Sequence, residues 1–186
     1  MKIETIEIAG FAGALTALRL PFGKEVRSKI RITRSWDRLN ELSDIVSEEN
    51  IRIDQKDLQL MTTLVKRGDE HAKVVRGIMV WARIKAPVYF TRELETYRAG
   101  RERLSSSSTM HQECQGLSGE ELQRAKAELP MGTEQDFVDV YSYQTLRRIV
   151  AQRHNHRLPE WHTFIDWVKT LPFAEELILV GLETEE

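Results

Sequence analysis

Residues 74–84 are apolar at both alternating sets of positions, and this limits what the rest of the chain can fold into. Ile78 and Val80 lie on one side of the extended stretch, and Met79 and Trp81 lie on the other. A strand with two apolar faces is typical of the interior of a sheet. The sequence therefore predicts a strand here that is buried on both sides.

The remaining stretches show strand patterns and helix patterns in turn. Alternation predicts strands over residues 2–8 and 26–34. Apolar stripes bounded by capping or stop residues predict helices at seven places. These predicted helices cover residues 11–19, 36–46, 54–68, 87–100, 118–130, 133–152 and 159–171. The mixture of strands and helices predicts the α+β class.

The composition is that of a globular protein. The 186 residues suit one domain, and 41% are hydrophobic and 30% charged. We expect a single domain over residues 1–180 and an acidic tail over 181–186. The net charge of −2 provides no overall field for nucleic acid or an anionic membrane, so an anion site has to be local.

Cysteine content and hydropathy indicate the cellular setting. Cys114 is the single cysteine, which excludes an intrachain disulfide and a cysteine-rich zinc site. No apolar stretch approaches the roughly 18 residues of a membrane span, and the N-terminus lacks a signal-peptide pattern. We therefore expect a cytoplasmic protein without a membrane partner.

A cluster of arginines is followed at once by hydroxyl groups. If the helix continues to Gly100, Tyr97 and Arg101 share one face and Arg98 lies beside them, while Arg103 emerges after the turn. The serines that follow are Ser105, Ser106, Ser107 and Ser108. Arginine forks, hydroxyls and free backbone N–H groups together favour an anion site, above all for phosphate. The alternative is a solvated helix end with a polar loop.

A second polar cluster ends the long predicted helix. Arg153 and Arg157 could line a site there, or could simply cap the helix dipole. His154 and His156 are two positions apart and do not share a helical face, so the sequence predicts no metal site. His71 precedes the central strand and could contact a ligand or lie on the surface.

The order of these parts resembles that of the flavin-dependent thymidylate synthases, the ThyX family, over roughly residues 55–172. The family signature is Arg-His-Arg followed by Asn-Glu-x-Ser-x-Arg-Tyr. Here Tyr97 and Arg98 stand where His-Arg would, Thr96 replaces the first arginine, and Ser106 matches the signature serine. The Asn-Glu pair and the final Arg-Tyr are absent.

The resemblance implies a single ThyX-like domain with a central mixed or antiparallel sheet and flanking helices. It implies an enzyme that transfers a one-carbon unit from methylenetetrahydrofolate to a uridine nucleotide of the dUMP type. FAD would be the cofactor and NADPH the source of hydride. Family members are usually tetramers with sites between subunits, so we expect a homotetramer, and a divergent, phage-type member of the family.

The resemblance also implies roles for individual residues, and the cofactor explains why no side-chain nucleophile is required. The expected cofactor-binding residues are His71, Tyr97, Arg98 and Arg101. The expected nucleotide-binding residues are Arg101, Ser105, Ser106, Ser107 and Arg157, and Arg153 is expected to polarise the base as the catalytic residue. Two alternatives remain: a non-catalytic ThyX-like protein that binds or sequesters a nucleotide, and a nucleic-acid-binding module, against which the acidic net charge counts.

Overall fold

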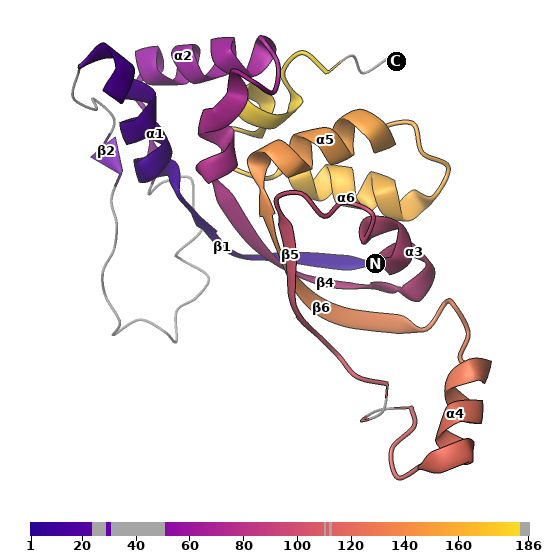
Figure 1. Ribbon diagram of the computed structural model, residues 1–186. Coiled ribbons are helices and arrows are strands. Elements are labelled where there is room, and N and C mark those ends of the chain that lie inside the picture. The colour runs from indigo at the N-terminus through magenta and orange to yellow at the C-terminus, as the bar shows by residue number, and fades with distance from the viewer. Residues whose placement is uncertain (24–28, 31–50, 110, 112, 183–186) are drawn as a thin grey trace.

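An antiparallel sheet of four strands, in the order β1-β4-β6-β5, lies at the centre of the structure (Figure 1). The computed structural model describes residues 1–23, 29–30, 51–109, 111 and 113–182. The strands of the sheet are β1 (Lys2–Ala9), β4 (Met79–Pro87), β5 (Arg101–Ser106) and β6 (Glu134–Ser142). Two further short strands, β2 (Lys29–Ile30) and β3 (Ile51–Arg52), pair with each other. The predicted α+β class with a central sheet is confirmed.

Helices lie on one side of this sheet and beyond both of its ends (Figure 1). They are α1 (Phe11–Arg19), α2 (Gln55–Lys66), α3 (Val88–Leu94), α4 (Gly119–Glu128), α5 (Tyr143–Arg153) and α6 (Pro159–Lys169). Three short segments are η1 (Leu20–Phe22), η5 (Ala72–Gly77) and the π-helical η6 (Glu175–Leu179). None of the described helices is long and apolar enough to cross a membrane.

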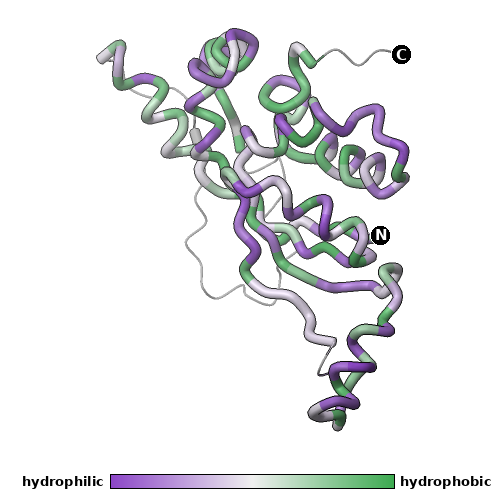
Figure 2. The backbone as a smooth tube through the Cα atoms, turned by 45° about the vertical axis from the view of Figure 1, so that its right-hand side comes forward, coloured by the Kyte–Doolittle hydropathy of each residue, from purple (hydrophilic) through white to green (hydrophobic). Residues whose placement is uncertain are grey.

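The core lies between the sheet and helices α3, α5 and α6 and continues among α1, α2, η5 and η6. Phe90 of α3 packs edge-on against Trp161 of α6, with ring centres 4.8 Å apart. On the sheet, Tyr141 packs against Phe164 of α6 at 5.8 Å. Helix α4, in contrast, has no buried residue and extends away from the body at the end of the β5–β6 connection, as two views show (Figures 1 and 2).

The central strand β4 is buried on one side only. Val80, Ala82 and Ile84 are fully buried, whereas Arg83 and Lys85 on the opposite face are exposed. The prediction of a strand buried on both sides is therefore wrong. The apolar residues on the second face are confined to the start of the strand and are only half-buried there.

The helix predicted over 133–152 is also wrong in its first half, because β6 occupies Glu134–Ser142 and α5 begins only at Tyr143. Phe137, Asp139 and Tyr141, which are every second residue of the strand, all point into the covered face of the sheet and are buried. Apolar residues also occupy the intervening positions, so the period of two is hidden in the sequence. Helix α5 begins where the side chain of Ser142 accepts a hydrogen bond from the N–H of Thr145.

Most of the other predicted elements are confirmed, and some lie partly or wholly outside the described residues. The strand over 2–8 and the helices α1, α2, α4 and α6 are confirmed within a few residues. Asp54 caps α2, as its side chain accepts a hydrogen bond from the N–H of Lys56. Of the strand predicted over 26–34, the described part is Lys29–Ile30. The helix predicted over 36–46 and residues 183–186 of the predicted tail lie outside the described residues.

Candidate functional site

The turn between α3 and β5 is fixed to the N-terminal end of α5. Thr145 Oγ1 donates a hydrogen bond to the carbonyl of Ala99 (2.8 Å), and the N–H of Ser142 donates to the carbonyl of Gly100 (2.8 Å). Gly100 has a φ of +76°, and a Cβ at this position would lie 2.4 Å from Thr145 Oγ1. Glycine is therefore required both by the backbone conformation and by the close approach to α5.

Near the other end of α5, Arg153 lies in a cluster formed by α3, α5 and α6. Its Nε donates to the hydroxyl of Tyr97 (2.8 Å), and its Nη1 lies 3.5 Å from Glu93 Oε2. The guanidinium carbon lies 4.7 Å from the centre of the Trp161 ring, a cation–π contact. Trp161 Nε1 donates to the same Glu93 oxygen (2.9 Å), and His156 Nε2 lies 3.5 Å from it. The structure thus brings together Tyr97 and Arg153, which belong to separate clusters in the sequence.

Arg98 follows Tyr97 on the same turn and is exposed. Within the described part of the chain, its guanidinium forms no hydrogen bond or ion pair. The same holds for the exposed side chain of Arg157, in the connection between α5 and α6. Because the turn is fixed at both ends, Arg98 presents free N–H donors from a defined backbone position, as an anion site requires.

Arg101 and Arg103 do not emerge at a helix end, as predicted, but point into the covered face of the sheet. Arg101 donates to Asp139 Oδ2 through Nε (2.8 Å) and Nη2 (2.5 Å), and to the carbonyl of Leu94 through Nη1 (3.1 Å). Arg103 Nε donates to the other oxygen of Asp139 (2.7 Å). Helix α3 ends at Leu94 and β5 begins at Arg101, so alternate residues share a face. The predicted shared helical face of Tyr97 and Arg101 is therefore wrong.

The environment of Asp139 explains how these charges are tolerated in the interior. Asp139 is fully buried, and the hydroxyl of Tyr141 donates to its Oδ2 (2.9 Å). Burial raises the pKa of the Tyr141 phenol, and so does the negative charge of Asp139. Burial opposes the charge of Arg101, but Tyr141 and Asp139 raise the pKa of the guanidinium above its ordinary value. This placement does not favour the predicted contact of Arg101 with a ligand.

Ser105 and Ser106 lie at the end of β5, and Ser107 and Ser108 follow in the loop. Ser105 and Ser106 are exposed and pair with β6, and Ser107 Oγ accepts a hydrogen bond from the N–H of Asp136 (3.1 Å). A register shift between Arg103 and Ser105 marks an irregularity in the strand. The hydroxyls of Ser105 and Ser106 are therefore available at an edge of the sheet.

His71 lies near a neighbouring face of α5. It is exposed at the start of η5, two residues after Asp69. Arg148 Nε donates to Asp69 Oδ2 (2.7 Å), and Gln144 Nε2 donates to the Asp69 carbonyl (3.4 Å). Burial alone would raise the pKa of Asp69, but its hydrogen bonds with Arg148 and Gln144 lower it. Since Gln144 precedes Thr145 directly, α5 supports both the His71 segment and the turn that carries Arg98.

Glu93, Trp161, Asp139 and Asp69 are the residues around these clusters that the sequence interpretation missed. Gln144 and Arg148 are four positions apart on α5 and both contact Asp69, so helical spacing contained a signal for this cluster. The other partners are distant in the sequence. Within the described part of the chain, no group of three or more histidine, cysteine or acidic residues could hold a metal ion.

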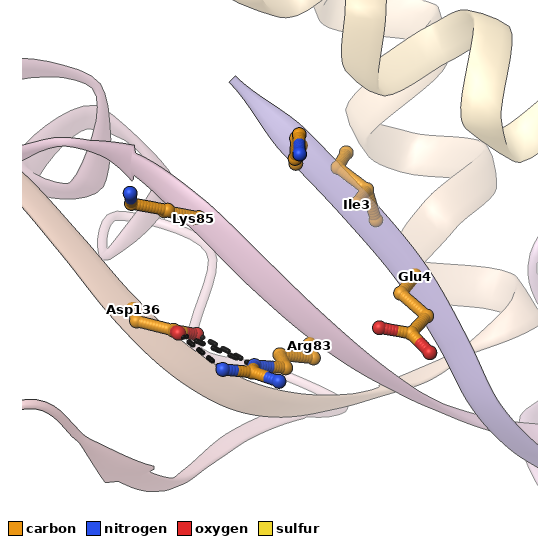
Figure 3. A pocket seen from close by; sticks show the side chains of 6 residues that line it. Ile3, Glu4, Arg83, Lys85 and Asp136 are labelled. Carbon is orange, nitrogen blue, oxygen red and sulfur yellow. Dashed lines mark hydrogen bonds and ion pairs between the residues drawn. The ribbon is translucent and has the colours of Figure 1, made fainter.

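A groove of about 510 Å³ lies on the uncovered face of the sheet (Figure 3). It is lined by Lys2, Ile3, Glu4, Arg83, Lys85 and Asp136. Arg83 forms a forked ion pair with Asp136 (2.7 Å), and Lys85 pairs with Glu134 (2.9 Å). Both pairs are partly exposed, and within each pair the positive and negative charges compensate one another. None of the predicted site residues lines the groove.

No protein-family model matches the sequence, and no curated protein matches it either. The fold is similar to two solved structures of ThyX from Helicobacter pylori, each with FAD and dUMP. The first has a TM-score of 0.67 and covers 98% of this chain and 99% of its own. The second has a TM-score of 0.68 and covers 100% of both chains. Each is 12% identical to this chain. It is also similar to the UMP/dUMP methylase PolB from Streptomyces cacaoi bound with 5-Br dUMP, with a TM-score of 0.64 at 12% identity over 97% and 95% of the two chains. The fold implied by the sequence resemblance is therefore confirmed.

Proposed function

We propose that this protein is a ThyX-like enzyme that transfers a one-carbon unit from methylenetetrahydrofolate to a uridine nucleotide of the dUMP type, using reduced flavin. The proposal depends above all on the hydrogen bond between Tyr97 and Arg153. It joins the two predicted clusters at one place, in a fold whose solved examples include proteins with bound FAD and dUMP. Fold alone does not specify function, so the argument rests on these side chains.

We propose that Ser105, Ser106 and Arg157, from the α5–α6 connection, bind the nucleotide, and that Arg98 binds a phosphate group. All four side chains are exposed. Arg153 would polarise the base, because Tyr97 holds its Nε and leaves part of the planar fork available. A cation fixed in this way stabilises negative charge that develops on the ring.

Arg98 offers one of the two phosphates of FAD a positive charge that has no partner in the described chain. Arg148, beside the His71 segment, is 41% exposed but is already paired with Asp69 (2.6 Å). Arg98, Tyr97 and His71 would hold the cofactor. When bound, FAD would supply the hydride, with NADPH as its proposed source. The protein's own residues would bind and orient the nucleotide and exclude water.

A non-catalytic ThyX-like nucleotide-binding protein is the second candidate, and one observation favours it. Arg101, Arg103 and Arg153 each lie beside a carboxylate, at 2.5, 2.7 and 3.5 Å. Arg98 and Arg157 are then the predicted site arginines without such a partner in the described chain. Two positive charges are enough to neutralise the single phosphate of a mononucleotide. They are too few for that phosphate together with the two phosphates of FAD. The same pairing weakens the case for a nucleic-acid-binding module.

The absorption spectrum of the purified protein, with and without added FAD, separates the two candidates. A flavin band together with conversion of dUMP to dTMP in the presence of methylenetetrahydrofolate and NADPH supports the enzyme. Binding of dUMP in calorimetry without any flavin band supports the binding protein. Absence of both would overturn the proposal.

We also propose a homotetramer, since the resemblance implies sites between subunits. Light scattering at micromolar concentration is expected to give about four times the 21.6 kDa of one chain. A mass equal to that of one chain would contradict this assembly.

A further inference from the structure

We propose that Arg153, Glu93 and His156 form a donor–acceptor–donor set that binds the edge of a uracil ring, and that Glu93 determines the preference for uracil over cytosine. The proposal rests on the proposed nucleotide-binding function. It goes further by naming the base and a residue that selects it.

The contacts of Glu93 leave one carboxylate oxygen free. Trp161 Nε1 donates to Oε2 (2.9 Å), and Arg153 Nη1 and His156 Nε2 both lie 3.5 Å from this same oxygen. Within the described chain, Oε1 has no partner, and the Glu93 side chain is 35% exposed. The indole N–H thus fixes one oxygen, while the other is an acceptor open to solvent.

Arg153 and His156, beside Glu93, provide donors. Arg153 uses Nε for Tyr97 and directs Nη1 toward Glu93, while its Nη2 has no partner in the described chain. His156 Nδ1 accepts a hydrogen bond from the N–H of Leu158 (3.2 Å), so the neutral ring carries its hydrogen on Nε2. Their side chains are 22% and 26% exposed, which leaves both within reach of a ligand.

This arrangement is complementary to uracil. The edge of uracil presents O2, N3–H and O4, which is the order acceptor, donor, acceptor. Cytosine presents an unprotonated N3 in the middle, which would face a carboxylate that can only accept. Sites that match a hydrogen-bonding edge reject an analogue that leaves their polar groups unpaired. If the cluster only fastened α3 to α6, the Trp161–Glu93 bond would be sufficient and base identity would not matter.

The substitution Glu93→Gln tests the proposal sharply. Indole is a donor only, so the amide oxygen of glutamine has to accept from Trp161, and the amide NH₂ then takes the place of Oε1. The central acceptor becomes a donor while the contact with α6 is kept. We expect dUMP binding by the full-length protein to weaken by about 10- to 100-fold, as measured by calorimetry. The ratio of dUMP to dCMP affinity should fall toward one, because in the variant each base leaves one donor facing a donor, at N3–H in uracil and at N4–H₂ in cytosine.

A neighbouring carboxylate provides the matched control. Glu95, at the end of the same helix, pairs with Arg103 (2.9 Å) and is 53% exposed, so Glu95→Gln should leave the dUMP-to-dCMP ratio unchanged. On the wild-type protein, N3-methyl-dUMP, which lacks the central donor, should bind at least about tenfold more weakly than dUMP. This comparison decides the matter even if Glu93→Gln does not fold.

The outcomes separate the inference from the function on which it rests. If the wild-type protein binds neither dUMP nor dCMP, the proposed function falls, and the inference with it. If dUMP binds but N3-methyl-dUMP binds equally well, or Glu93→Gln keeps the parental ratio, the inference alone is overturned.

Discussion

Arg101 and Asp139 form a buried ion pair across strands β5 and β6, with Arg101 Nη2 2.5 Å from Asp139 Oδ2. The two residues are 38 positions apart in the sequence. Arg103 pairs with the second oxygen of the same carboxylate at 2.7 Å. The most prominent arginines of the serine-rich segment are therefore used to hold an edge strand against the sheet. The ligand-binding role that we propose is therefore assigned to Arg98, on the turn that precedes them.

The first prediction concerns this pair. Asp139→Asn leaves the buried guanidinium of Arg101 without a counter-charge and leaves Arg103 with Glu95 as its carboxylate partner, so we expect the free energy of unfolding to fall by about 3–5 kcal/mol. Urea denaturation measures the loss. Asp136→Asn is the control, since Asp136 lies on the same strand and also pairs with an arginine, but is partly exposed. It should cost at most about 1 kcal/mol. Equal losses in both variants would show that burial of the Asp139 network contributes no special stability.

The second prediction concerns Arg98. Because its guanidinium is exposed and free of partners in the described chain, Arg98→Ala should leave stability within about 0.5 kcal/mol of the parent. Binding of dUMP or FAD should weaken by roughly 1.5–3 kcal/mol, the scale of a hydrogen bond to a charged group. The control is Arg92→Ala, which removes an exposed arginine from the preceding helix α3 and should leave binding unchanged. Parental affinity in Arg98→Ala, measured by calorimetry, would reject the assignment.

The third prediction uses two glycines that both have positive φ. At Gly100 (φ +76°), an added methyl group would lie 2.4 Å from Thr145 Oγ1, whereas at Gly116 (φ +82°) it would meet no atom within 4 Å. Gly116→Ala should therefore cost only the backbone strain, about 1 kcal/mol. Gly100→Ala should cost roughly 1–3 kcal/mol more, because the turn has to move off α5. Nucleotide binding should weaken along with it, since Arg98 is on this turn. Similar unfolding free energies for the two variants would mean that the turn is not held as tightly as the contacts indicate.

Local patterns were sufficient for part of this fold. The capping residue Asp54 and the periodic apolar stripe of α6 are local features that can be recognised in a single sequence. Strand β6 was missed because Val138, Tyr141 and Thr145 also fit helical spacing. Its assignment as a strand depends on pairing with β4 and β5 on either side, which is a non-local property.

The site shows the same division between local and distant information. Arg98 and Arg153 stand in two polar clusters of the sequence, but the bond from Arg153 to Tyr97 spans 56 positions. No local pattern predicts such a contact. Nor does a local pattern reveal that Arg101 faces the interior, since this follows from where α3 ends and β5 begins.

The last prediction asks whether Arg153 is structural or acts on a ligand. Arg153→Lys keeps the positive charge but loses the planar fork, so it loses the 2.8 Å hydrogen bond to Tyr97 and the free N–H donors together. Tyr97→Phe removes the same hydrogen bond and leaves the guanidinium over Trp161, 4.7 Å from the ring centre. Both variants should lose about 0.5–1.5 kcal/mol of stability, as one hydrogen bond contributes.

Their effects on function should differ. If Arg153 polarises the base, Arg153→Lys lowers turnover of dUMP, or its affinity if there is no turnover, by at least about tenfold, which corresponds to roughly 1.4 kcal/mol. Tyr97→Phe should have a clearly smaller effect on dUMP affinity measured without flavin, because the fork is still present and the contact proposed between Tyr97 and the cofactor does not enter this measurement. Paired measurements of urea stability and of kcat/KM or Kd on the two variants make the comparison. If the two lose function in proportion to their loss of stability, Arg153 serves only to fasten α5 to the turn, and base polarisation has to come from another group.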